Sequence, residues 1–353
     1  MNSLSLVAWL ACLWGITPTH AFLGVPGAQQ PLILATSTPT TNYSVGFSLA
    51  SSYGSAAVII DNALAEKETR TWVVYGDDEY QAVMARLSLE SSRHLAPPYG
   101  DMDEYFKDIP RVMARRTRKK AGLPASHDVG VLSGVIRELR SQIESDLGIT
   151  ISDATLTTTH LEALYQDDVE DICEYAKLKY IIPKAMFHPI LWEASSAYAG
   201  YGFGLCKHWR NDTRCQEELF PSTHVLAVHY SRTALTSTLA TIRTAIGALE
   251  PLSMRMVSFE LGWDARKKYA SEQEYWRNVK AAIVQRMVET PAMEKPKSIV
   301  LTGDMVDGEF RKALEEAVME HMGRVPPVFA QDALVVAAKG AAEFRRRGQA
   351  KWQ

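Results

Sequence analysis

The chain has 353 residues, of which 46% are hydrophobic and 22% are charged. This composition is typical of a globular protein, and the length is sufficient for two lobes with a shared or divided core. The formal net charge of -3 creates no overall positive field, so the composition implies neither nucleic acid nor an anionic membrane as a partner.

Residues 1–21 have the pattern of a secretory signal peptide. The apolar stretch from Leu4 to Ile16 is too short to span a bilayer, and Thr19-His20-Ala21 places small residues at a cleavage site. We therefore expect a mature chain from Phe22 in the secretory pathway or outside the cell, with no membrane span. An uncleaved N-terminal anchor is the alternative, because no Lys or Arg precedes the apolar stretch.

Glycosylation and disulfide signals agree with a secretory route. Asn42 and Asn211 each begin an acceptor sequon without proline. Cys206 and Cys215 bracket a polar segment that contains the second sequon, which favours a local disulfide. Cys173 lies on an apolar helical stripe, so we expect a buried structural thiol rather than a nucleophile.

The first structural elements predicted are strands. Residues 22–43 are rich in Pro, Thr, Ser and Gln without a period, which predicts an extended leader. After it, β-branched and aromatic residues predict two strands paired around a small-residue turn and a third strand downstream. These strands are expected at 44–49, 55–60 and 71–75.

A polar, proline-containing stretch from His94 to Val129 follows, which we interpret as a variable insertion. It carries one of two basic runs, 115–120, and the other lies at 345–347. Either run could contact phosphates or be cut by a dibasic-specific protease, but a solvated face is the simpler interpretation.

Helices and strands then alternate. Apolar residues from Val131 to Leu147 recur at helical spacing, and Gly148 provides a C-cap. A strand is expected at 153–159 and a helix at 166–178. The Ala-, Gly- and Ser-rich segment 192–205 has no Lys-Ser/Thr after its glycines, which favours a tightly packed helix end over a phosphate loop.

The second half repeats the opening pattern. Residues 225–239 predict another strand, turn and strand, as a duplicated lobe would. Ser271 can cap a helix that runs through Met287, and a strand follows at 299–301. A helix at 307–322 and a final small-residue helix around Gly340 complete the chain.

Two C-terminal segments carry a family resemblance. Ser298-Ile299-Val300-Leu301-Thr302-Gly303-Asp304 predicts a buried strand that breaks at a glycine, and Gly340-Ala341-Ala342 allows close backbone approach. Together they resemble the adenosine-side signature of the actin-like ATPases, which include actin, sugar kinases and the seventy-kilodalton heat-shock chaperones.

The resemblance implies an α/β fold with two pseudo-symmetric lobes around a central cleft, at 44–205 and 206–353. Only about 70 residues separate His229 from Ile299, so the resemblance implies a reduced lid subdomain. The pattern is similar to that of divergent secreted fungal members of the superfamily, of the heat-shock chaperone type.

The phosphate loops that the resemblance implies are degenerate. Ser48 stands where the family has the first-loop Asp, although Ser51 and Ser52 keep the hydroxyls. In the second loop His229 replaces the Asp and Arg232 takes the place of a glycine. Phosphoryl transfer depends on electrostatic positioning, so losing both carboxylates argues against ATP hydrolysis. Arg232 could bind phosphate directly, or it could be a structural ion-pair partner.

The resemblance therefore predicts a pseudo-ATPase that serves as a secreted binding or scaffolding protein. A cleft reused as an enzyme or binding site for a small metabolite is the alternative. ATP or another nucleotide is left open as a ligand, no metal site is predicted, and any partner in the cleft is a small molecule or a protein. The residues that would line such a site are Ser48, Ser51, Ser52, His229, Ser231, Arg232, Gly303, Asp304, Lys339 and Gly340.

Overall fold

A computed structural model describes residues 42–61, 67–181, 190–205, 222–242, 255–291 and 294–348. All of them belong to one unit, residues 39–353. The predicted signal peptide, the predicted leader up to residue 41, the sequon at Asn211 and the cysteines Cys206 and Cys215 lie outside the described residues. Asn42 is described, and it is exposed at the first position of β1.

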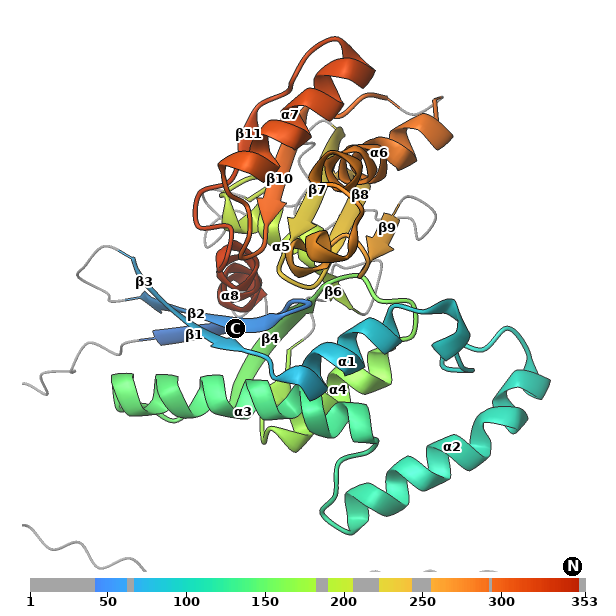
Figure 1. The fold of residues 1–353 in the computed structure, drawn as a ribbon. Helices are drawn as coiled ribbons and strands as arrows, with labels where there is room; N and C mark the ends of the chain where they lie inside the picture. Colours follow the sequence, from blue (N-terminus) through green and yellow to red (C-terminus); the bar gives the residue numbers. More distant parts are fainter. Residues whose placement is uncertain are drawn as a thin grey trace, which may run out of the picture. The chain divides into compact units, whose positions relative to one another are not determined.

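The first sheet combines an antiparallel meander with parallel strands (Figure 1). Its strand order is β3-β2-β1-β4-β5, and β6 pairs with β4. β1 runs antiparallel to β2 and parallel to β4. The strand bounds are β1 Asn42–Leu49, β2 Tyr53–Asp61, β3 Glu68–Tyr75, β4 Asp153–Thr158, β5 Lys179–Tyr180 and β6 Leu191–Trp192.

The second sheet has the same topology. Its order is β9-β8-β7-β10-β11, where β7 is antiparallel to β8 and parallel to β10. The bounds are β7 Thr223–Tyr230, β8 Leu235–Ile242, β9 Arg255–Ser258, β10 Ser298–Thr302 and β11 Val328–Phe329. The α/β class and the predicted duplication are thus confirmed.

Helices of the first lobe cover its sheet with apolar side chains. They are α1 Asp78–Leu87, α3 His127–Leu147 and α4 Gln166–Tyr175, with a short 3-10 helix at Glu90–Ser92. Met84, Ile136 and Ile172 are fully buried in the core that these helices share with β1 and β2. Gly148 ends α3 with φ 63°, the left-handed C-cap that the sequence predicts.

The second lobe packs two helices on its sheet. These are α6 Glu272–Glu289, which Ser271 caps by accepting the Glu274 N–H, and α7 Gly308–Met322. In the described part of the interval from 231 to 297, the elements besides α6 are β8, β9 and the 3-10 helix η4 Trp263–Lys268. This content fits the reduced lid subdomain.

Two small-residue helices, α5 Glu193–Gly200 and α8 Val336–Gly348, pack against each other (Figure 1). α5 ends at the glycine-rich turn, as the sequence predicts. α8 also packs on β1, β2 and β4 of the first sheet, although its residues lie in the range assigned to the second lobe. The boundary at residue 205 stays a prediction.

Side-chain ion pairs attach α8 to the first sheet. Arg345 pairs with Asp153, and Arg346 pairs with Asp61, both at 2.6 Å or less. The basic run 345–347 is therefore part of the packing, and its interpretation as a solvated face was wrong. Cys173 is buried and has no disulfide partner among the described residues, and burial raises the pKa of its thiol to about 12, which confirms the prediction of a buried structural thiol.

The stretch at 94–129 is more regular than predicted. It contains α2, a 19-residue helix at Met102–Lys120 whose N-cap Asp101 accepts the Glu104 N–H. Arg115 and Lys119 from the first basic run form ion pairs with Asp171 on α4. Within the described ranges, α2 and the other helices all lack the combined length and apolar character that a bilayer crossing requires.

Candidate functional site between the two strand turns

The duplicated topology places two equivalent turns, one after β1 and one after β7. In the first turn the Ala50 N–H donates to the Tyr53 carbonyl at 2.9 Å, and in the second the Ser231 N–H donates to the Ala234 carbonyl at 2.9 Å. The resemblance assigns the two phosphate loops to these turns. Their side chains therefore decide what the site can bind.

The two turns touch each other directly. Ser51 Oγ lies 2.6 Å from Ser231 Oγ and 3.2 Å from His229 Nε2. All three side chains are buried, with Ser51 only 1% exposed. The space between the loops is thus filled by their own side chains.

His229 continues this network away from the turns. Its Nδ1 lies 2.9 Å from Glu193 Oε1 and 3.1 Å from Thr302 Oγ1. Because an ionised carboxylate only accepts, Nδ1–H donates to Glu193. A neutral His229 therefore accepts the Ser51 hydroxyl at Nε2, whereas a charged His229 donates to Ser51, which then donates to Ser231.

The charge state of His229 is set by opposing effects. Burial disfavours its charged form, but the carboxylates of Glu193 and Asp304 outweigh burial and raise the pKa of the imidazole. Burial raises the pKa of Asp304, against the lowering effect of the Arg232 N–H and of His229. The two carboxyl groups therefore favour the charged form of His229, against the effect of its burial.

This arrangement makes stability depend on pH. The pKa of His229 is higher in the folded than in the unfolded chain, so its contribution is complete below the unfolded value of about 6.5 and is lost as pH rises through the folded value. We expect His229→Gln to lower the unfolding free energy more at roughly pH 6 than at roughly pH 9. This range lies on both sides of the reference pKa of histidine, about 6.5. Urea unfolding across this range measures it, and a pH-independent difference would contradict it.

Four other predicted site residues lie on β1 or in the turns and loops beside this network. Ser48 is buried on β1, where its register neighbours are Ser55 on β2 and Thr157 on β4. The Arg232 N–H donates to Asp304 Oδ1 at 3.1 Å. Ser52 Oγ and Asp304 Oδ2 are buried without a partner among the described residues, so a water or a small polar ligand would satisfy them.

The predicted cationic residues are engaged with carboxylates. Arg232 pairs with Asp264 at 3.5 Å on an exposed part of the turn, which supports its interpretation as an ion-pair partner. Lys339 pairs with Asp332 at 2.6 Å. Neither presents an uncommitted charge to an anion.

The two predicted glycines have a structural explanation. A Cβ at Gly303, which has φ +116°, would lie 2.0 Å from the Tyr230 carbonyl oxygen. A Cβ at Gly340 would lie 1.7 Å from the Ser196 carbonyl oxygen on α5. Both positions require glycine because backbones meet there, so neither needs a nucleotide to explain it.

A small cavity beside His229 is lined by none of the turn residues Ser51, Ser52 and Ser231. The cavity beside His229 measures about 20 Å³, which is about the space of one water molecule. Its lining includes Glu193, His229 and Thr302, so this cavity lies beside the Glu193–His229 pair and is not the space between the two turns. Groups of three or more His, Cys, Asp or Glu side chains that could hold a metal do not occur among the described residues.

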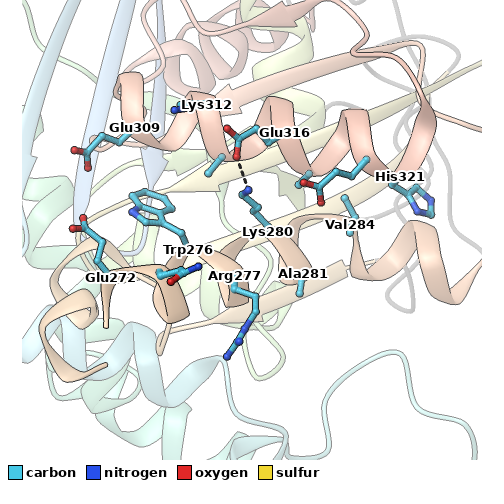
Figure 2. A pocket seen from close by; sticks show the side chains of 14 residues that line it. Glu272, Trp276, Arg277, Lys280, Ala281, Val284, Glu309, Lys312, Glu316 and His321 are labelled. Atoms are coloured by element: carbon cyan, nitrogen blue, oxygen red, sulfur yellow. Dashed lines mark ion pairs between the residues drawn. The ribbon is translucent and has the colours of Figure 1, made fainter. Parts of the chain in front are cut away.

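A much larger cavity, of about 990 Å³, lies between α6 and α7 (Figure 2). Trp276 and Val284 contribute apolar surface, and Lys280 from α6 pairs with Glu316 from α7 at 2.5 Å. Its lining mixes both signs of charge along the two helices. This cavity therefore has no evident preference for an anion or a cation. The charged lining residues are Glu272, Arg277, Lys280, Glu309, Lys312, Glu316 and Glu320.

Sequence reasoning missed Glu193 and Thr302, the two partners of His229 Nδ1. Glu193 is the first residue of α5, where an acidic side chain is favoured by the helix dipole. The position of Glu193 at the start of a helix is the one local feature of the sequence that points to this residue. Its pairing with a histidine 36 positions away has no signature in a single sequence.

No family model matches the chain, and no curated protein matches it. Among solved structures, the chain is similar to the ethanolamine utilization protein EutJ from Carboxydothermus hydrogenoformans, with a TM-score of 0.43. The identity is 11%, over 86% of this chain and 90% of that one. The duplicated strand order defines the architecture. The chain has an α/β fold with two sheets of equivalent strand order.

Proposed function

We propose that this protein is a pseudo-ATPase, a secreted binding or scaffolding protein that hydrolyses ATP weakly or not at all. The contact of Ser51 with Ser231 and His229 supports this most directly, because it joins the two turns to which the resemblance assigns the phosphate loops. An isolated buried cation would attract phosphate, but His229 is already paired with Glu193. In this proposal the fold acts as a scaffold that binds a partner without turning over a nucleotide.

Calorimetry with ATP, with and without Mg²⁺, tests this proposal together with an assay of phosphate release. We expect no phosphate release by the wild type, and no binding tighter than about 1 mM, the weak end of the usual affinity range. The double variant Ser51→Gly/Ser231→Gly removes the two hydroxyls that fill the site. Binding gained only by this variant would identify the closed loops as the cause.

Two outcomes would contradict the proposal. Mg²⁺-dependent phosphate release by the wild type that Asp304→Ala abolishes would indicate a true ATPase. Labelling of Ser51 by a serine-directed fluorophosphonate, lost in His229→Gln, would indicate that the site is reused as an enzyme for a small metabolite.

The reuse alternative has one specific observation in its favour. Glu193, His229 and Ser51 are hydrogen-bonded in the order of an acid, histidine and serine triad. Against it, Ser51 is 1% exposed, so a carbonyl group cannot reach its Oγ in this conformation. The pseudo-ATPase is therefore the better supported function.

A further inference from the structure

The helix α2 is oriented with its polar side toward the protein. Arg111 pairs with Asp167 at 2.7 Å, and Arg115 pairs with Asp168 and Asp171 at 2.6 Å. Lys119 extends the row to Glu174 on α4 at 2.6 Å. Ion pairs, not apolar contacts, thus join α2 to α4, and the opposite side of α2 faces away from this row.

That opposite side is apolar. Of the eleven large hydrophobic side chains exposed in the described residues, five lie on α2, so the surface is concentrated on one helix. Their spacing of three and four residues puts them on one helical face. They are Met102, Tyr105, Phe106, Ile109 and Met113, between 37% and 61% exposed, and we call them the α2 stripe.

Basic residues continue the same face. Arg116 lies three residues after Met113 and Lys120 lies four residues after Arg116, and both are exposed. Neither forms an ion pair with a described residue, in contrast to Arg115 and Lys119 on the other side. The net charge of -3 hides this local arrangement, which combines an exposed apolar row with cations.

We propose that the α2 stripe binds the surface of a bilayer that contains anionic phospholipid. An amphipathic helix with aromatic and aliphatic residues on one face lies in the membrane interface, and neighbouring Lys and Arg attract anionic headgroups. Charge complementarity favours this occupant, because Arg116 and Lys120 lie on the contacting face. The proposal is independent of the nucleotide site.

A second copy of the chain fits this face less well. A standard protein interface uses about 20–30 residues on each side, whereas the stripe offers five side chains. A deformable lipid surface needs no matching pocket on its partner, so a short row of exposed side chains is sufficient for it.

Co-sedimentation of the full chain with phosphatidylcholine vesicles, with and without phosphatidylserine, tests the proposal. We expect binding to the anionic vesicles only, and a loss of at least about tenfold for Phe106→Ser/Met113→Ser, since two exposed apolar side chains are removed. The variant Arg116→Gln/Lys120→Gln should weaken binding by about fivefold for each cation removed. Circular dichroism verifies that each variant is folded.

The matched control is Val288→Ser/Met319→Ser, which removes two hydrophobic side chains that are 55% and 49% exposed on α6 and α7. We expect this variant to bind like the wild type. An equal loss in the control would overturn the proposal, as would equal binding to both kinds of vesicle or no binding at all. A dimer in light scattering that Phe106→Ser/Met113→Ser dissociates, without lipid binding, would assign the stripe to a second copy instead.

Discussion

Replacing Gly340 by alanine should lower the unfolding free energy by about 3 kcal/mol or more, the upper range for overpacking. The added Cβ would lie 1.7 Å from the Ser196 carbonyl oxygen and 3.0 Å from the Gly200 N, so it meets backbone that cannot rotate away. α5 and α8 would have to separate, and α8 also covers the first sheet. Chemical denaturation monitored by tryptophan fluorescence measures the change.

Gly134 provides the matched control. It lies inside α3, and a Cβ there would meet nothing within 4 Å. Because alanine is the better helix former, Gly134→Ala should stabilise the protein by roughly 0.5–1 kcal/mol. If both substitutions had similar effects, the close approach of α5 and α8 would not be the cause.

The second large effect concerns the buried pair Glu193 and His229. Removing His229 leaves a carboxylate that is 6% exposed without its partner, and breaking such a pair costs about 3–5 kcal/mol. We expect His229→Ala and Glu193→Ala each to be strongly destabilising. The double variant should cost less than their sum, by about 0.5–3 kcal/mol, since no unpaired charge is left. Urea unfolding of the four proteins gives this coupling.

An exposed pair of the same residue types serves as the control. His127 Nε2 lies 3.0 Å from Glu79 Oε1, but both side chains are more than 60% exposed. Solvent screens such a pair, so its coupling should be within error of zero. Strict additivity at Glu193 and His229 as well would contradict their role as a coupled pair.

The strands and most helix ends could be predicted from local signals. Ser271 and Gly148 terminate helices through chemistry that operates within a few residues. α2 escaped prediction because Pro110 lies inside it and because its apolar residues face outward. The spacing of Met102, Phe106 and Ile109 is typical of a helix, but these side chains are exposed and do not pack into a core.

The candidate site was only partly accessible to sequence reasoning. The resemblance assigned Ser51, His229 and Ser231 to one site by aligning the two turns, and the Ser51 side chain lies within hydrogen-bonding distance of the other two. Glu193, which sequence reasoning missed, lies on α5. Its contact with His229 depends on how α5 packs near the second sheet. Gly303 and Gly340 were assigned to a ligand, whereas backbone contacts already require them.

The position of α8 has a consequence for the order of folding during synthesis. The first sheet spans β1 to β6, at residues 42 to 192, yet α8 covers part of it from residues 336–348. During synthesis, all strands of the second sheet are therefore translated before α8 can cover the first sheet. Buried residues such as Ala57 and Ile59, which pack against Ala338 and Ala342, stay exposed until then. The nascent chain thus carries a temporary apolar surface, where a chaperone could bind it.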